Sequence, residues 1–258
     1  MEAPVLVRSL VEEGILQLTV NRPHALNALN QEVFEALRDF FVQGYKDYDP
    51  LYGLIISGAG DKSFVAGADI QELSSLKEES ARELVQRGHK VMDLIEGFHI
   101  PVVAAVNGYA LGGGLELAMS THLKIAVPKA QFGLPELKLG LIPGYGGTQR
   151  LATYVGRAKA MEMTLTSAFM SADEALTNRL INQIVEPEQL IPSAIALIRK
   201  ISERGPTAVS LAIQTINAQA HHAMAKEQDA FCHLLLSAEG KEGTTAFLEK
   251  RKPNFRKK

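Results

Sequence analysis

Two glutamates in this sequence have the residue type and the setting for acid–base chemistry. Glu116 lies just after the glycine run at 112–114, and Glu136 follows Pro135 twenty residues further along. Two carboxyl groups that converge on one small pocket can share acid and base duties, because desolvation and mutual repulsion separate their pKa values. A glycine run at the start of a helix also presents N–H groups that suit an oxyanion or a phosphate.

The glycine run at 112–114 has a plain interpretation and three functional ones. A tight strand-to-helix turn needs glycine only because the backbone is crowded. A Walker phosphate loop requires lysine after the last glycine, where this chain has Leu115. For a dinucleotide fingerprint, Gly58-Ala59-Gly60 lacks the third glycine, and the glycines at 144–147 follow a proline loop instead of a strand. An oxyanion-stabilising turn with Gly113 at the mouth of a helix fits best.

Glu116 alone would indicate little, because a glutamate in a first helical turn commonly just stabilises the helix dipole. Glu136 changes this interpretation, since it is flanked by the apolar residues Leu134 and Pro135 and is poorly placed as a solvated charge. The two acids together favour an active site. Their spacing leaves open whether they meet.

The hydrophobic pattern predicts the elements that would position these acids. Strands are predicted at 4–20 (two strands with a turn at 12–14), 52–57, 102–106, 123–127 and 180–185. Helices are predicted after Asn30, at about 80–97, and from the first glutamate, Glu116, to about 120. Further helices are predicted at 148–155, 157–165 and 171–178, and over most of the last seventy residues. Residues 64–70 are expected to form a loop. This alternation followed by a helical tail predicts an α/β core with a C-terminal helical subdomain.

Composition limits the class of protein. The chain has 258 residues, 46% of them hydrophobic, which is enough for one large domain or for one domain with a small appendage. A net charge of −2 provides no general attraction to nucleic acid or membrane. The single cysteine, Cys232, fits a reducing compartment, and neither a signal peptide nor a membrane-length apolar stretch is evident. A cytoplasmic location is therefore expected.

Other catalytic patterns are missing from the sequence. The seven histidines are scattered, with no HExxH motif or Cys/His cluster, so no metal site is predicted. No Gly-x-Ser-x-Gly elbow is present either. Cys232 lies in an apolar stretch and is interpreted as a packed thiol.

Four segments in order resemble the enoyl-CoA hydratase/isomerase family, also called the crotonase superfamily. They are 21–29, 63–70, the stretch 107–150 that contains both glutamates, and 241–252. The resemblance implies an α/β fold, a crotonase-type spiral of ββα units with a C-terminal helical subdomain. It further implies a spiral core with the active site at 1–195, a helical oligomerisation region at 196–258, and a homotrimer or homohexamer.

The same resemblance implies an acyl-CoA substrate whose thioester oxygen lies between the backbone N–H groups of Ala68 and Gly113. Glu116 would deprotonate the attacking water and Glu136 would protonate the α-carbon, so that an enoyl-CoA becomes a 3-hydroxyacyl-CoA, as in fatty-acid β-oxidation. Substrate and coenzyme A contacts are expected at His24, Ala25, Leu26, Ala66, Asp69, Ile70, Gln71, Gly144, Phe247 and Lys250. No separate cofactor is implied, because coenzyme A is part of the substrate.

Three alternatives remain at this point. One is another reaction of the same family, such as double-bond isomerisation or hydration of a branched or carboxylated enoyl-CoA. Another is hydration of a carrier-protein thioester, and the third is a non-catalytic RNA-binding relative, against which the net acidic charge argues. Retention of both glutamates favours hydration. Leu115 and Tyr145 depart from the small residues common in related hydratases, and both are expected near the acyl pocket, where they would affect chain-length preference.

Overall fold

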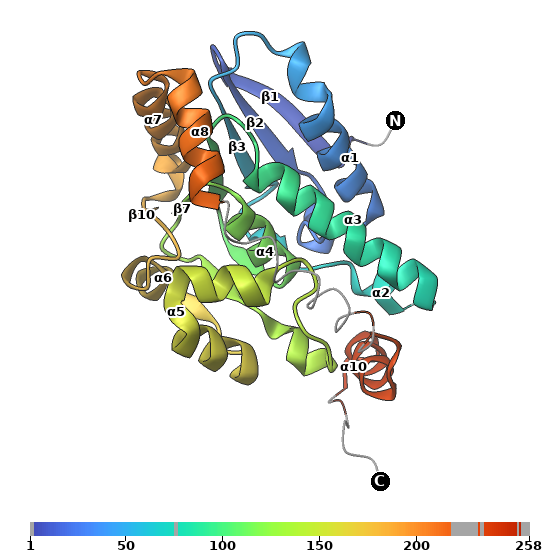
Figure 1. The fold of residues 1–258 in the computed structure, drawn as a ribbon. Helices are drawn as coiled ribbons and strands as arrows, with labels where there is room; N and C mark the ends of the chain where they lie inside the picture. Colours follow the sequence, from blue (N-terminus) through green and yellow to red (C-terminus); the bar gives the residue numbers. More distant parts are fainter. Residues whose placement is uncertain (1–2, 75–76, 218–231, 233–234, 252, 254–258) are drawn as a thin grey trace.

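Two β-sheets form the centre of the structure. The computed structural model describes residues 3–74, 77–217, 232, 235–251 and 253 (Figure 1). The larger sheet has the strand order β1-β2-β3-β5-β7-β10, in which β1 and β2 are antiparallel and the other neighbours are parallel. Its strands are β1 (Leu6–Glu12), β2 (Ile15–Val20), β3 (Gly53–Gly58), β5 (Val102–Val106), β7 (Leu123–Ala126) and β10 (Gln183–Ile184).

The smaller sheet has the order β4-β6-β8-β9, with β9 antiparallel to β8. Its strands are β4 (Ser63–Ala66), β6 (Tyr109–Leu111), β8 (Gln131–Gly133) and β9 (Met170–Ser171). The sequence pattern misses this sheet, because its strands are only two to four residues long. The loop expected at 64–70 was therefore wrong at its start, which belongs to β4.

A strand of the large sheet, a strand of the small sheet and a helix follow one another repeatedly. The order is β3-β4-α3, then β5-β6-α4, then β7-β8-α5. The helices of these units are α3 (Glu78–Glu96), α4 (Gly113–Ser120) and α5 (Gly147–Thr166). This arrangement confirms the expected spiral of ββα units. In the second unit, the glycine run begins in the turn between β6 and α4 and continues into the first residues of α4. In the other two units, a short helix lies between the second strand and the main helix.

The remaining helices largely match the sequence-based expectations. Asn30 caps α1 by accepting a hydrogen bond from the N–H of Val33 at 3.1 Å. Gly156 interrupts α5 with a φ of 78°, which explains why two helices were predicted there. The other helices are α1 (Gln31–Val42), α2 (Ile70–Ser74), α6 (Ala172–Thr177), α7 (Leu190–Ser202), α8 (Pro206–Asn217) and α10 (Ala238–Leu248), with short 3-10 helices at Pro23–Ala25, Gly44–Asp47, Pro135–Leu139 (η3) and Pro187–Gln189 (η4).

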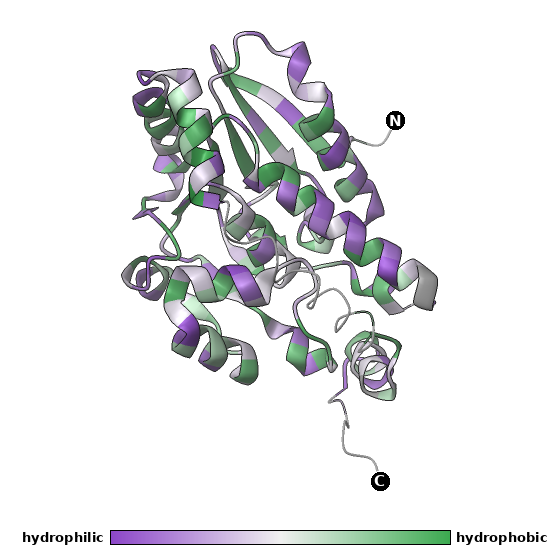
Figure 2. Ribbon diagram, viewed as in Figure 1, coloured by the Kyte–Doolittle hydropathy of each residue, from purple (hydrophilic) through white to green (hydrophobic). Residues whose placement is uncertain are grey.

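The core lies between the large sheet and its helices. Strands β3 and β5 are buried along their whole length, as expected for central parallel strands. Helix α7 packs on β3, β5 and β7, while α1 packs against α3. Figure 2 shows α1 and α3 with hydrophobic and hydrophilic residues on different sides. The hydrophobic side of α1 carries the residues expected from its periodicity, Val33, Phe34, Leu37, Phe40 and Phe41.

The C-terminal part of the described chain is helical. Helix α7 runs across residue 195, so the expected boundary between core and helical region falls inside one helix. Helix α10 contacts α2 and η3, the two short elements that flank the candidate site. The division into two regions stays a prediction. Over the described residues, no helix is long and apolar enough to cross a membrane.

A partly buried histidine predicts how stability depends on pH. His122 Nδ1 accepts the N–H of Val102 at 3.0 Å, and Nε2 lies 3.1 Å from the carbonyl oxygen of Glu96. Both bonds suit a neutral ring, and burial lowers the pKa of His122 to about 4. Since the unfolded chain binds this proton near pH 6.5, the free energy of unfolding should fall as pH drops from 6.5 towards 4, by up to about 3 kcal/mol.

Urea unfolding at several pH values checks this contribution. His122→Asn should be less stable than wild type at pH 7, because one of the two bonds is lost. Its stability should then decline less steeply than that of wild type between pH 6.5 and 4. His99→Asn, at an exposed position, serves as the control. Equal slopes for wild type and His122→Asn would contradict the prediction.

Candidate active site

One cavity of about 120 Å³ brings the two glutamates together. It also contains the two residues expected to bind the thioester oxygen, Ala68 and Gly113, and the expected substrate contact Gly144. The remaining lining residues are Ala66, Gly67, Ile70, Leu73, Gly112, Pro135, Leu139, Leu141, Tyr145 and Phe247. The question that the sequence spacing left open is therefore answered, because Glu116 and Glu136 share one cavity.

Glu116 is held in a fixed orientation. It lies in the first turn of α4 and is 1% exposed. Its Oε1 accepts the backbone N–H of Tyr145 at 2.7 Å and that of Gly147 at 2.8 Å. Gly147 is the first residue of α5, so this carboxyl group lies at the N-terminal ends of two helices. Both helix dipoles favour a negative charge there.

Glu136 approaches the same turn from the other side. It lies in η3, directly after Pro135, and is half-buried. A Cβ atom placed on Gly112 would be only 2.8 Å from Glu136 Oε1, so the carboxyl group lies against the backbone that precedes α4. The N–H of Gly112 donates to the carbonyl of Gly133 at 2.8 Å, which ties this turn to the segment leading into η3.

Gly112→Ala should impair activity through the position of Glu136. Gly112 has φ 51° and ψ −126°, a conformation that an alanine adopts only with strain of about 1–3 kcal/mol. The added methyl group would also overlap Glu136 Oε1. We expect kcat to fall by roughly tenfold or more, as for a misplaced catalytic group. Gly205→Ala, where the nearest atom is 3.9 Å away, is the matched control and should retain wild-type turnover.

The backbone N–H groups of Ala68 and Gly113 take no part in the hydrogen bonds of the adjacent strand and helix. Ala68 forms an isolated parallel bridge with Leu29, but the bonds are made by its neighbours: Leu29 N–H to Gly67 O and Asp69 N–H to Leu29 O. Successive N–H groups of an extended segment point to opposite sides, so the N–H of Ala68 points away from Leu29. Gly113 is the first residue of α4, where no residue of the helix can accept its N–H.

A second, larger hollow of about 550 Å³ leads into the cavity. The two share Ala66, Ala68, Ile70 and Phe247 as lining residues. Eight of the expected coenzyme A contacts line this groove: His24, Ala25, Leu26, Ala66, Asp69, Ile70, Gln71 and Phe247. Gly144 lines only the inner cavity, and Lys250 lines neither, because it follows α10 at an exposed position.

Arg22 organises this groove and was not expected from the sequence. Its Nη2 pairs with Asp69 Oδ2 at 2.9 Å, and its Nη1 donates to the carbonyl of Ala28 at 2.7 Å. Asp69 also accepts the N–H of Gln71 at the start of α2. Asp69 is therefore part of an ion pair that fixes the groove wall. The quoted segment 21–29 contains this arginine, but the sequence does not reveal its partner.

Arg150 is a second residue that the sequence analysis did not assign. It is 3% exposed, and its Nη1 donates to the carbonyl of Tyr145 at 2.8 Å. Its Nη2 pairs with Glu96 at 2.7 Å and with Asp93 at 3.1 Å, both on α3. Arg150 thereby anchors to α3 the loop whose N–H groups hold Glu116. It is a positioning residue.

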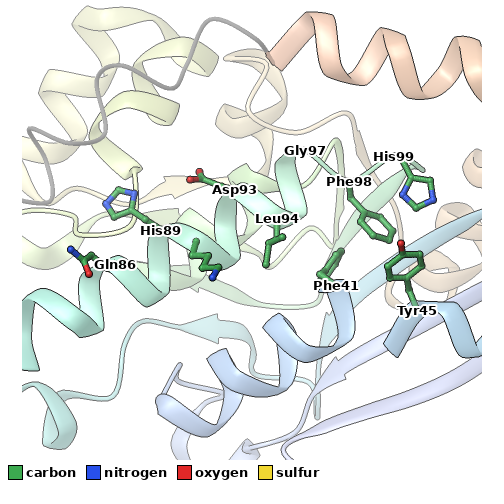
Figure 3. A pocket seen from close by; sticks show the side chains of 10 residues that line it. Phe41, Tyr45, Gln86, His89, Asp93, Leu94, Gly97, Phe98 and His99 are labelled. Carbon is green, nitrogen blue, oxygen red and sulfur yellow. The ribbon is translucent and has the colours of Figure 1, made fainter. Parts of the chain in front are cut away.

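A further hollow of about 580 Å³ lies between α1 and α3. Figure 3 shows His89 and Gln86 towards one end and the rings of Phe41, Tyr45, Phe98 and His99 gathered at the other. The phenylalanine rings pack edge to face at 4.9 Å. Burial lowers the pKa of His89 to about 4, so this ring is neutral at pH 7. Of the described residues that line this hollow, none was expected in the site.

Leu115 and Tyr145 were both expected near the acyl pocket. Tyr145 lines the cavity, whereas Leu115 is fully buried and is not among its lining residues. Among the described residues, no group of three or more His, Cys, Asp or Glu side chains is arranged to hold a metal ion.

Comparison with known proteins identifies the family to which this chain belongs. The model of the enoyl-CoA hydratase/isomerase family matches residues 11–258. The chain belongs to this family. The enoyl-CoA hydratase/isomerase relatives include the crotonyl-CoA hydratase of Syntrophomonas wolfei, 45% identical over 95% of both chains. They also include the short-chain-enoyl-CoA hydratase of Clostridium acetobutylicum, 42% identical over 94% of this chain and 95% of the relative.

Solved structures of the enoyl-CoA hydratase/isomerase family have the same fold. The enoyl-CoA hydratase from Bacillus anthracis superposes with a TM-score of 0.79 at 33% identity, covering 98% of this chain and 99% of that chain. The crotonase-type fold expected from the sequence is therefore confirmed over nearly the full chain.

Proposed function

We propose that the protein is an enoyl-CoA hydratase that adds water across the 2,3-double bond of a short-chain enoyl-CoA to give a 3-hydroxyacyl-CoA, a step of fatty-acid β-oxidation. The observation that carries this proposal is the presence of Glu116 and Glu136 in one small cavity with Ala68 and Gly113. The printed names of the two hydratase relatives, from Syntrophomonas wolfei and Clostridium acetobutylicum, support this substrate class.

The first requirement of the reaction is an electron sink. Water that attacks the β-carbon of an enoyl thioester drives electrons onto the thioester oxygen. The backbone N–H groups of Ala68 and Gly113 stabilise this enolate, and the α4 dipole adds to the effect of Gly113. Fixed backbone donors are effective because they need no reorganisation as the charge develops.

The second requirement is two proton transfers, one from the attacking water and one to the α-carbon. Glu116, oriented by the N–H groups of Tyr145 and Gly147, removes a proton from the attacking water. Glu136, against Gly112, delivers a proton to the α-carbon of the enolate. The hydroxyl group thus forms at the β-carbon, and the α-carbon receives its hydrogen. Both carboxyl groups line the same cavity, so both transfers take place beside one bound substrate.

The remaining assignments belong to the same proposal. Coenzyme A occupies the groove lined by His24, Ala25 and Leu26, with Phe247 at its junction with the cavity. Lys250 reaches the coenzyme A of a neighbouring subunit in a homotrimer or homohexamer formed through 196–258. Its exposed position outside the groove supports this role. The single cysteine supports a cytoplasmic location.

The test is a spectrophotometric assay with crotonyl-CoA, in which the absorbance of the conjugated enoyl thioester disappears. The product should gain the mass of one water molecule. Vinylacetyl-CoA, which carries a β,γ-double bond, tests the isomerase alternative in the same assay, and crotonyl carrier protein tests the carrier thioester. No loss of crotonyl-CoA from a folded protein that binds coenzyme A would refute the proposal. Binding to AU-rich RNA without turnover would favour the RNA-binding alternative.

A further inference from the structure

The side chain of Tyr145 forms part of the cavity wall that the coenzyme A groove does not share. It is 3% exposed and lines the cavity with Glu116 and Gly113, but it does not line the groove. The groove and the cavity meet at Ala66, Ala68, Ile70 and Phe247. An acyl chain that enters from the groove would therefore extend towards the Tyr145 ring.

The ring of Tyr145 is packed tightly between three helices. It meets the ring of Phe34 on α1 edge to face, with centroids 5.2 Å apart and an interplanar angle of 71°. A Cβ atom on Gly88 of α3 would be 2.2 Å from the ring, so the ring occupies the space that any other residue would need. A Cβ atom on Gly113 of α4 would be 3.3 Å from it. The ring has little freedom to move aside.

Tyr145 is poorly suited to proton transfer. Burial raises the pKa of its hydroxyl well above the ordinary value, and the negative charge of Glu116 raises it further. The side chain therefore stays a neutral phenol over the range in which the two carboxyl groups work. Its contribution to the site is its shape.

The cavity is small for an acyl group. Its volume of about 120 Å³ corresponds to about four water molecules at ~30 Å³ each, well below the ~300–1,000 Å³ of pockets for drug-sized ligands. The larger groove, of about 550 Å³, meets this cavity at the four lining residues that the two share. Space inside the cavity is therefore sufficient for the reacting carbons and little more.

We propose that Tyr145 is the residue that limits acyl chain length, with Gly88 providing the space for its ring. This inference rests on the proposed hydratase function. Removal of the ring would extend the cavity into the space bounded by Phe34, Gly88 and Gly113, where additional methylene groups of the substrate would be buried. Each buried methylene favours binding by about fourfold.

The test is a chain-length profile of kcat/KM with crotonyl-, hexenoyl-, octenoyl- and decenoyl-CoA. The ratio of decenoyl-CoA to crotonyl-CoA within each variant removes any general loss of activity. For wild type we expect a ratio below ~0.1, and for Tyr145→Ala a ratio at least ~10-fold higher. Tyr145→Phe is the matched control, because it keeps the ring and should keep the wild-type ratio.

Tyr145→Leu is a second variant in case the alanine protein does not fold, and its ratio should lie between those of wild type and the alanine variant. An unchanged ratio in whichever small-residue variant folds would overturn the proposal. So would a wild-type protein that prefers decenoyl-CoA to crotonyl-CoA. These failures differ from failure of the proposed function, in which wild type hydrates none of the four substrates.

Discussion

Glu136→Gln is expected to lower kcat for hydration of crotonyl-CoA by at least ~100-fold, the effect of losing general acid–base assistance. Glutamine has almost the same shape as glutamate, so the packing of the side chain against Gly112 should be retained. What is lost is the ability to deliver a proton to the α-carbon. Because substrate binding does not need that proton, the effect should fall mainly on kcat and less on KM.

Glu188→Gln is the control for this prediction, since Glu188 is an exposed glutamate in η4. It should retain wild-type kinetics. Circular dichroism and thermal unfolding would establish that the Glu136 variant is folded. Turnover of the Glu136 variant within a few-fold of wild type would show that this carboxyl group takes no part in proton transfer.

Much of the fold was accessible from the sequence, because long apolar runs determine it. The strands at 102–106 and 123–127 were predicted nearly to the residue. The first is continuously hydrophobic, as expected for a central parallel strand, and the second is apolar except for Lys124. The small sheet was not, because strands of two to four residues carry too little periodicity. Their pairing depends on contacts between ββα units, which no local pattern records.

The acids of the candidate site could be predicted from the sequence, but the arginines that position the surrounding segments could not. Glycine runs and acids in apolar settings drew attention to Glu116 and Glu136, and the structure places both in one cavity. The partners of Arg22 and Arg150 are 47 and 54–57 residues away in the sequence, and an arginine gives no sign of which distant acid it will meet. The close packing of the Tyr145 ring on Gly88 could not be predicted from the sequence either, since it depends on how α3 packs beside the loop that precedes α5.

Glu116→Gln is expected to reduce hydration by at least ~100-fold as well, but at a different step. The amide oxygen of glutamine can still accept the N–H groups of Tyr145 and Gly147, so the loop before α5 should keep its conformation. The neutral amide cannot remove a proton from water. Attack on the β-carbon would then depend on unassisted water, although the thioester is still polarised by Ala68 and Gly113.

The two variants can be distinguished with butyryl-CoA in deuterium oxide. This substrate has neither a double bond nor a β-hydroxyl group, so only its α-protons can exchange, a reaction that needs the base at the α-carbon and stabilisation of the enolate. NMR should show exchange catalysed by wild type and by Glu116→Gln, and none by Glu136→Gln. The reverse pattern would exchange the roles of the two carboxyl groups, and exchange lost in both variants would mean that they act only as a coupled pair.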